Sequence, residues 1–157
     1  VDIERWRHVR PPGAGPSKPG PLDARLLVWR LFPGVEPELL LAGLEAGARG
    51  VVLEAFGAGN VPVRERSLEP FLAQAEARGV PVVLRTQCDH GRVDTTLYEG
   101  GALAARYGAI DAGAMSTEAA TMKLAVLLGQ GADRDAVAAG FAEDWAGEQG
   151  RYAGRPM

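Results

Sequence analysis

The stretch GVVLEAFGAGNVP (residues 50–62) decides how this chain is expected to fold. Its first six residues form a nearly continuous apolar run with two adjacent valines, which is typical of a central strand in a parallel sheet covered on both faces. The strand ends on a turn that contains Gly57 and Gly59 and is followed by Asn60. Glycine permits positive φ angles and lets other groups approach the backbone closely. Two interpretations stay open, a plain tight loop or a turn that is cleared for a small polar ligand.

Strand-like and helix-like patterns alternate around this stretch. Strands are predicted at 24–32, 50–55, 80–86 and, as a short fourth strand, 109–113, and helices at 36–47, 67–79, 95–108, 116–130 and 133–148. This alternation predicts βαβ units. The expected fold is therefore α/β, a small parallel sheet flanked by helices on both faces, of flavodoxin-like or Rossmann-like type.

Ligands of open α/β sheets bind beyond the carboxyl ends of the strands. This rule marks two loops, 56–62 (FGAGNVP) and 86–94 (TQCDHGRVD). If the strands at 50–55 and 80–86 are neighbours, the two loops should lie side by side. Asn60 offers one acceptor and two donors, which suit the amino or carboxylate group of a small ligand. The turn is not a dinucleotide fingerprint, because no third glycine opens a helix after it.

Length and composition bound the organisation of the chain. Its 157 residues, 46% of them hydrophobic, suffice for one domain with a buried core. Residues 10–21 (RPPGAGPSKPGP) are rich in proline and glycine, as linkers are. We expect residues 1–22 to be a linker or the tail of a missing N-terminal domain, residues 23–147 to be the α/β domain and residues 148–157 to be a flexible tail.

Charge and residue content argue against several classes of protein. A net charge of −3 with interspersed signs disfavours nucleic acid binding, and no apolar run approaches the roughly 20 residues of a membrane span. Cys88 is the only cysteine, which excludes an internal disulfide and fits a reducing, cytoplasmic compartment. The only histidine besides His90 is His8, which lies in the N-terminal part that is expected to be flexible, so no metal site is expected.

The run Cys88-Asp89-His90 allows a cysteine nucleophile beside an imidazole. Side chains this near in sequence often diverge, so we favour the alternative of a small apolar cysteine beneath the sheet end and a solvent-facing His90. No contact between them follows from the sequence.

Further predictions concern residues in or next to two of the predicted helices. Asp94 and Thr95 are expected to cap the helix that follows them, and Tyr98 to lie in the core or in an interface. Trp145 is expected to continue the apolar stripe of the helix at 133–148.

Three motifs, taken in order, resemble one family: GVVLEAFGAGNVP (50–62), TQCDHGRVDTTLYEGG (86–101) and GAMSTEAATMKLAVLL (113–128). They look like the C-terminal domain of L-asparaginases, most of all the cytosolic type I branch, over residues 24–130. The similarity extends to the archaeal amidotransferase subunit that acts on Glu-tRNA(Gln). The resemblance implies an amidohydrolase that converts L-asparagine to L-aspartate and ammonia, needs no cofactor and works as a homo-oligomer.

In this family the nucleophilic threonine lies in an N-terminal domain, within a Thr-Gly-Gly-Thr motif. The present chain contains no Thr-Gly pair. The resemblance therefore implies that this chain holds no catalytic residue, that a missing N-terminal domain supplies them, and that the chain alone cannot hydrolyse asparagine.

The resemblance also assigns residues to a substrate site. Asn60, in the turn of Gly57 and Gly59, is similar to the asparagine that reaches the active site of a neighbouring subunit and helps to hold the substrate amino group. Arg92 stands where some secreted members have a glutamate that serves the same site, and Gln87 flanks the site on the same loop.

Cooperative type I members carry an allosteric asparagine site, to which Cys88 and Glu54 correspond. Cys88 matches a cysteine of that site, whereas Glu54 replaces an arginine, so an effector carboxylate would meet like charge. Two other functions stay open: a non-catalytic module that binds asparagine, aspartate or a related amino acid, and a subunit of a Glu-tRNA(Gln) amidotransferase.

Overall fold

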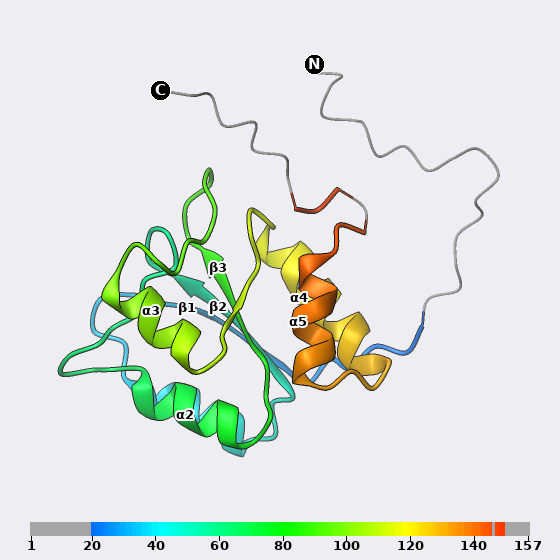
Figure 1. Ribbon diagram of the computed structural model, residues 1–157. Coiled ribbons are helices and arrows are strands. Elements are labelled where there is room, and N and C mark those ends of the chain that lie inside the picture. Colours follow the sequence, from blue (N-terminus) through cyan, green and yellow to red (C-terminus); the bar gives the residue numbers. More distant parts are fainter. Residues whose placement is uncertain (1–19, 146, 150–157) are drawn as a thin grey trace, which may run out of the picture.

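The computed structural model describes residues 20–145 and 147–149 (Figure 1). Its elements follow the predicted order: β1 (Leu26–Arg30), α1 (Pro37–Glu45), β2 (Gly50–Ala55), α2 (Glu69–Ala77), β3 (Val82–Thr86), α3 (Glu99–Arg106), β4 (Ile110–Asp111), α4 (Thr117–Gly129) and α5 (Arg134–Ala142). Most of the predicted linker (1–22) and tail (148–157) lies outside the described residues. The chain enters the domain along α4, where the N–H of Asp23 donates to the carbonyl of Ala125 at 3.0 Å.

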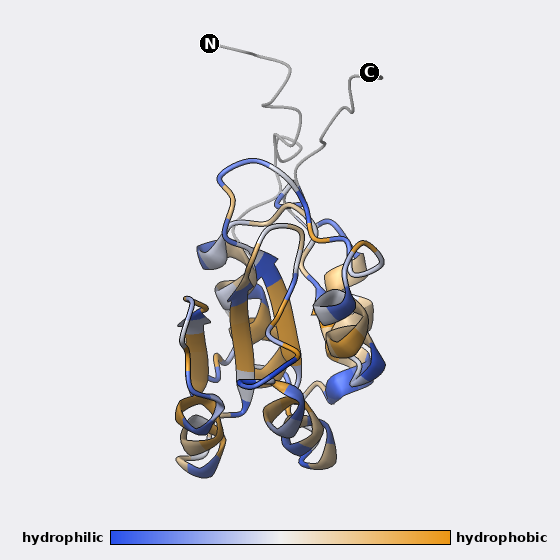
Figure 2. Ribbon diagram, turned by 90° about the vertical axis from the view of Figure 1, so that its left-hand side faces the viewer, coloured by the Kyte–Doolittle hydropathy of each residue, from blue (hydrophilic) through white to orange (hydrophobic). Residues whose placement is uncertain are grey.

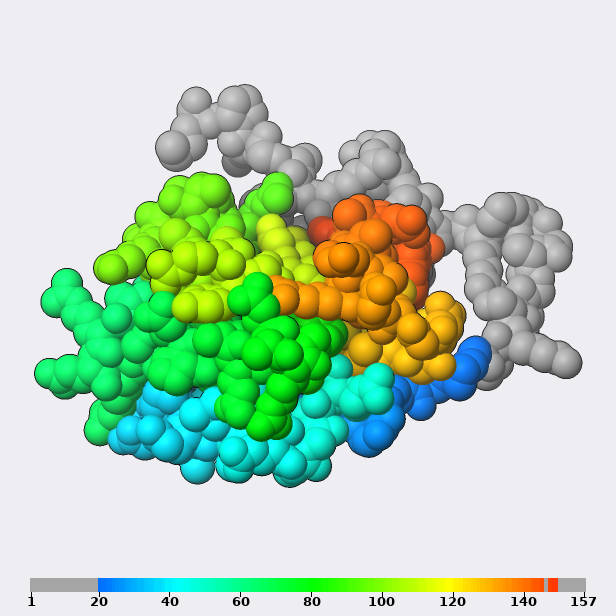
Figure 3. Space-filling view, turned by 60° about the horizontal axis from the view of Figure 1, so that its bottom comes forward, coloured from blue at the N-terminus to red at the C-terminus, as the bar shows by residue number. Residues whose placement is uncertain are grey.

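The strands form one parallel sheet in the order β1-β2-β3-β4. Because successive crossovers run in the same direction and such crossovers are right-handed, α1, α2 and α3 should share one face. One buried apolar cluster lies under these helices, and a second lies between the sheet and the pair α4 and α5. Figure 2 shows the largely hydrophobic strands with hydrophilic tips at their carboxyl ends, and Figure 3 shows α1, α2 and α3 side by side. The predicted α/β fold is confirmed.

β2 is buried along its whole length, as expected for a central strand. Val51 and Leu53 belong to the cluster under α1, α2 and α3, whereas Val52 belongs to the cluster under α4. This is the period of two that a strand imposes on its side chains. Glu54 follows the same alternation and therefore faces α4, so a carboxylate enters an otherwise apolar strand at its carboxyl end.

The helix predicted at 95–108 begins only at Glu99, and the predicted cap was wrong. The carboxylate of Asp94 accepts hydrogen bonds from the backbone N–H (3.0 Å) and the hydroxyl (2.6 Å) of Thr96. This local turn competes with helical geometry, so the residues before Glu99 stay outside the helix. The residue at the N-cap position is Tyr98, whose side chain makes no capping bond.

The helix predicted at 133–148 ends at Ala142, because Glu143 has an extended backbone (φ −90°, ψ 146°). Trp145 therefore does not continue the helical stripe. It is 46% exposed, and its ring lies 4.6 Å from the ammonium nitrogen of Lys123. The chain after α5 is thus held by polar contacts rather than by helix packing.

Candidate functional site

The residues after β2 close into a tight turn. The N–H of Phe56 donates to the carbonyl of Asn60 at 3.0 Å, and the N–H of Asn60 donates back to the carbonyl of Phe56 at 2.8 Å. Gly57 (φ +49°) and Gly59 (φ +104°) both adopt positive φ, which other residues rarely do. Gly59 is required for a second reason, since a Cβ there would lie 2.8 Å from Cγ1 of Val93.

The loop after β3 lies against this turn, as predicted. The hydroxyl of Thr86 donates to the carbonyl of Gly57 and accepts a hydrogen bond from the N–H of Cys88 at 3.0 Å. The N–H of Asp94 donates to the carbonyl of Ala58 at 2.8 Å. The two loops that follow the neighbouring strands β2 and β3 therefore form one unit.

The side chain of Asn60 is fixed by the first turn of α3. Its oxygen Oδ1 accepts a hydrogen bond from the N–H of Gly100 at 3.0 Å. A Cβ at Gly100 would lie 2.3 Å from this oxygen and 2.1 Å from the carbonyl oxygen of Val61, so only glycine allows this approach. Among the described residues the side-chain NH₂ of Asn60 has no hydrogen-bond partner. Two donors and one lone pair of Oδ1 are left for a ligand.

Thr86 and Gly100 hold the turn, and neither role was predicted from the sequence. Gly100 stands beside Gly101 in a helical pattern, where glycine is unfavourable and usually has a packing reason. Thr86 is a polar residue at the last position of an apolar strand, and it is only 3% exposed. The glycine pair and the polar residue at the end of an apolar run were visible in the sequence, whereas the burial of Thr86 is not.

Glu54 lies on the α4 face of the sheet. Its Oε1 accepts a hydrogen bond from the hydroxyl of Thr117, and its Oε2 lies 3.4 Å from Nη1 of Arg30. Its register partners on the neighbouring strands are Arg30 and Arg85, so a basic residue stands on each side of the carboxylate. In the part of the chain that the structure describes, no hydrogen bond or ion pair joins Glu54 to Cys88.

Gln87 braces the carboxyl ends of β1 and β2. Its side-chain nitrogen Nε2 donates to the carbonyls of Leu31 (2.6 Å) and Glu54 (2.8 Å), and its backbone N–H donates to the carbonyl of Ala55 (3.0 Å). The amide hydrogens of Gln87 are therefore used within the fold beside the turn.

The residues Cys88, Asp89 and His90 are exposed. The expected burial of Cys88 was wrong, because the chain turns outward after Thr86, whereas the solvent-facing His90 is confirmed. Tyr98 is 57% exposed, so its predicted place in the core was wrong and its place in an interface stays a prediction.

Arg92 lines a cavity of about 610 Å³ between β4 and α5, together with Asp111, Gly113, Arg134 and Gln149. Burial raises the pKa of the Asp111 carboxyl, while its hydrogen bond from the N–H of Gly113 (2.5 Å) and the charge of Arg92 oppose that rise. Arg92 thus faces the cavity beside β4, whereas the next two residues of the loop, Val93 and Asp94, contact the turn after β2.

Two features are absent from residues 20–145 and 147–149. No group of three or more His, Cys, Asp and Glu side chains is placed to hold a metal ion there. No helix in this part of the chain combines the length and the apolar character that crossing a membrane requires.

The fold and the two loops define a class, an α/β domain that presents a polar turn at the carboxyl ends of parallel strands. Within that class, residues 25–141 match the glutaminase/asparaginase C-terminal domain family, and the chain belongs to this family.

Two relatives and one solved structure illustrate the match. An L-asparaginase of Thermococcus kodakarensis is 41% identical over 127 residues, which are 81% of this chain and 38% of that protein. A glutamyl-tRNA(Gln) amidotransferase subunit of Methanothermobacter thermautotrophicus is 32% identical over 127 residues, 81% of this chain and 28% of that protein. The solved thermostable L-asparaginase of T. kodakarensis gives a TM-score of 0.80 at 39% identity, covering 90% of this chain and 43% of that chain. The chain spans less than half of the length of these relatives.

Proposed function

We propose that this chain is the C-terminal domain of an L-asparaginase-type amidohydrolase, which converts L-asparagine to L-aspartate and ammonia. The observation that carries the proposal is the side chain of Asn60, which Gly100 holds through Oδ1 and which keeps one lone pair of that oxygen for the substrate ammonium and its NH₂ donors for a carboxylate. A side chain that is already ordered loses little freedom when a substrate binds. Its place in a domain of the glutaminase/asparaginase family supports an amino-acid amide as that substrate.

The chain completes a substrate site and takes part in assembly, while hydrolysis needs a catalytic domain outside it. The threonines Thr86, Thr117 and Thr121 use their hydroxyls in bonds within the domain, and no threonine of the chain precedes a glycine. Asn60, with Gly57 and Gly59, serves the active site of a neighbouring subunit in this proposal. The working enzyme is then a homo-oligomer, and we place it in the cytoplasm.

The test is ammonia release from L-asparagine by the natural protein that contains this chain. Asn60→Ala should raise KM by about ten-fold or more, because hydrogen bonds to charged groups contribute about 1.5–3 kcal/mol. Arg64→Ala is the control, since this exposed residue on the same loop makes no side-chain hydrogen bond or ion pair with the described residues. An unchanged KM for Asn60→Ala, or ammonia release by the isolated chain, would contradict the proposal.

A second candidate function is that of an amidotransferase subunit, because a glutamyl-tRNA(Gln) amidotransferase subunit matches the same share of this chain as the asparaginase does. Such a protein would work with a partner protein and a tRNA. Co-purification of the natural protein with tRNA, together with ammonia release that depends on it, would favour this candidate. Saturable binding of L-asparagine to a natural protein that never releases ammonia would instead indicate a non-catalytic amino-acid-binding module.

Regulation at the place of Glu54 and Cys88 is not expected to follow the type I form. The carboxylate of Glu54 is bonded to Thr117 and lies near Arg30, and an effector carboxylate would meet its like charge. Asparagine saturation of the natural enzyme should be hyperbolic, with a Hill coefficient of about 1. A clearly sigmoidal curve that becomes hyperbolic in Glu54→Leu would contradict this expectation.

A further inference from the structure

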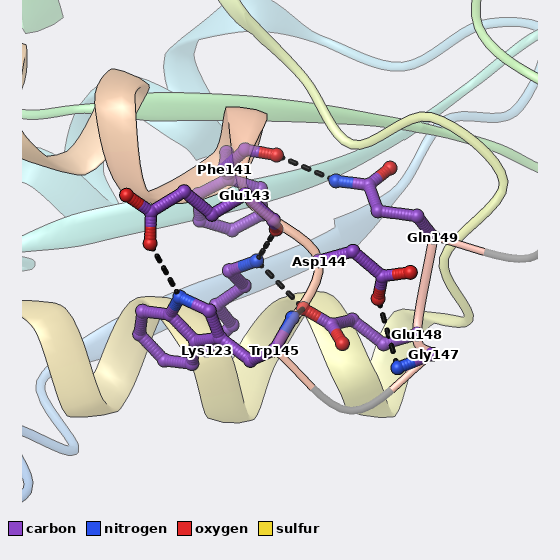
Figure 4. Close-up of polar contacts among 8 residues, drawn as sticks. All are labelled: Lys123, Phe141, Glu143, Asp144, Trp145, Gly147, Glu148 and Gln149. Atoms are coloured by element: carbon purple, nitrogen blue, oxygen red, sulfur yellow. Dashed lines mark hydrogen bonds and ion pairs between the residues drawn. The ribbon is translucent and has the colours of Figure 1, made fainter. Parts of the chain in front are cut away.

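Lys123 is a charged residue buried in α4, with 3% of its side chain exposed. Its ammonium nitrogen lies 2.6 Å from Oε1 of Glu148 and donates to the carbonyl of Glu143. The rings of Trp145 and Phe141 lie 4.6 and 5.6 Å from the same nitrogen (Figure 4). A buried ammonium requires ion pairing and hydrogen bonds. Lys123 therefore needs these partners in order to stay buried, and its ammonium in turn holds them in place.

The polar partners of Lys123 come from the chain after α5, residues 143–145 and 147–149, here called the C-terminal segment. The N–H of Trp145 donates to Oε1 of Glu148 at 3.0 Å, and its indole N–H donates to Oε2 of Glu143 at 3.1 Å. At the end of the segment, Nε2 of Gln149 donates to the carbonyl of Phe141 at 2.5 Å (Figure 4). Lys123 and the end of α5 together fix the place of Gln149.

Gln149 reaches the loop after β4. A Cβ at Gly113 would lie 2.5 Å from Oε1 of Gln149, so the two residues are in close contact. The carbonyl of Gly113 accepts a hydrogen bond from the N–H of Val93 at 3.3 Å. Val93 is fully buried and packs directly on Gly59. A continuous series of contacts thus leads from α4 to the turn after β2.

We propose that Lys123 is a positioning residue for the candidate site. By holding the C-terminal segment it keeps Gln149 against Gly113, and so keeps Val93 against the turn that carries Asn60. The consequence for substrate binding rests on the proposed function, whereas the consequence for the turn does not. Loss of the ammonium should loosen the turn and raise KM for L-asparagine while kcat changes less than two-fold, because Lys123 lies outside the reacting groups.

The test is amide hydrogen exchange in the natural protein that contains this chain, with Lys123→Met. Methionine keeps an apolar stem and removes the charge. Exchange should rise about ten-fold or more at Val93 and Asp94 and in the C-terminal segment, and far less in β2, because local opening is distinct from global unfolding. Arg106→Met is the matched control: it removes an exposed cation that pairs with Glu69 at 2.7 Å on the other face of the sheet, and it should leave Val93 and Asp94 unchanged.

A second variant, Gln149→Ala, cuts the last contact and leaves Lys123 paired. It should raise amide hydrogen exchange at Val93 and Asp94 but not at Trp145. If Lys123→Met fails to fold, the exchange measured in Gln149→Ala tests the proposal by itself. Exchange that rises only in the C-terminal segment, or equally throughout the sheet, overturns the proposal. Raised exchange at Asp94 with an unchanged KM for L-asparagine supports the positioning role and contradicts the substrate role of the turn.

Discussion

The N–H of Gly100 donates to Oδ1 of Asn60 at 3.0 Å, across forty residues of sequence. Gly100 stands in the first turn of α3, where backbone N–H groups have no partner within the helix. Because the side chain of the N-cap residue Tyr98 makes no capping hydrogen bond, Asn60 supplies the missing cap from a distant turn. One contact therefore completes the helix and orients the candidate site residue.

Gly100→Ala should disrupt this relationship. The added Cβ would lie 2.1 Å from the carbonyl oxygen of Val61 and 2.3 Å from Oδ1 of Asn60, and both belong to the turn rather than to a movable surface side chain. We expect a loss of about 2–3 kcal/mol in the free energy of unfolding, the upper part of the roughly 1–3 kcal/mol that overpacking usually costs, because both clashing atoms are held within the turn. Chemical denaturation measures it. Gly20→Ala, whose Cβ would meet nothing nearer than 3.7 Å, is the control and should change stability by less than about 0.5 kcal/mol.

Thr86→Val should separate the two loops while keeping the size of the side chain. The variant removes the donor to the carbonyl of Gly57 and the acceptor of the N–H of Cys88. Loss of these bonds at a site that is 3% exposed should cost about 1–3 kcal/mol of unfolding free energy, and hydrogen exchange at Cys88 should rise.

Thr121 is a control that tests whether the effect of Thr86→Val depends on where the lost hydroxyl stands. Thr121 donates to the carbonyl of Thr117 within α4 at 2.6 Å, so Thr121→Val loses a bond that does not join separate loops. It should change stability by less than about 1 kcal/mol and leave exchange at Cys88 unaltered. Equal effects of the two variants would show that Thr86 has no special role in joining the loops.

The sequence predicted the fold because its strands have unambiguous patterns. The apolar run of β2 indicated a strand covered on both faces, and the adjacency of the loops after β2 and β3 followed from parallel pairing alone. The contact of Asn60 with Gly100 could not be predicted. It depends on where α3 begins, and the bonds between Asp94 and Thr96 decide that.

Glu54, on the other face of the sheet, is a second residue whose contact could not be predicted from the sequence. Its position in β2 indicated burial, but its partner Thr117 stands sixty-three residues later, at the start of α4. Sequence spacing carries no information about such a contact until the packing of α4 on the sheet is known. The hydroxyl of Thr117 and the nearby Arg30 are what make a buried carboxylate tolerable at that position.

Asp111→Asn should make stability less sensitive to pH. Burial raises the pKa of Asp111 above its ordinary 3.8, so the folded protein binds this proton more tightly than the unfolded chain does. The resulting stabilisation is complete below the unfolded pKa and is lost as the pH rises through the folded pKa. Relative to the wild type, the Asp111→Asn variant should therefore gain stability as the pH rises above about 4, by less than about 1 kcal/mol because solvent screens a partly exposed carboxyl.

Asp94→Asn should show the opposite sign in the same denaturation series. The hydrogen bonds from Thr96 lower the pKa of Asp94, so its ionised form stabilises the fold above the unfolded pKa, and this contribution is lost as the pH falls through the folded pKa. The Asp94→Asn variant should approach the wild type in stability as the pH drops below about 4, where the Asp111→Asn variant has lost its advantage. Melting temperatures at acidic to neutral pH measure both trends, and parallel curves for the two variants would contradict the opposite pKa directions of Asp111 and Asp94.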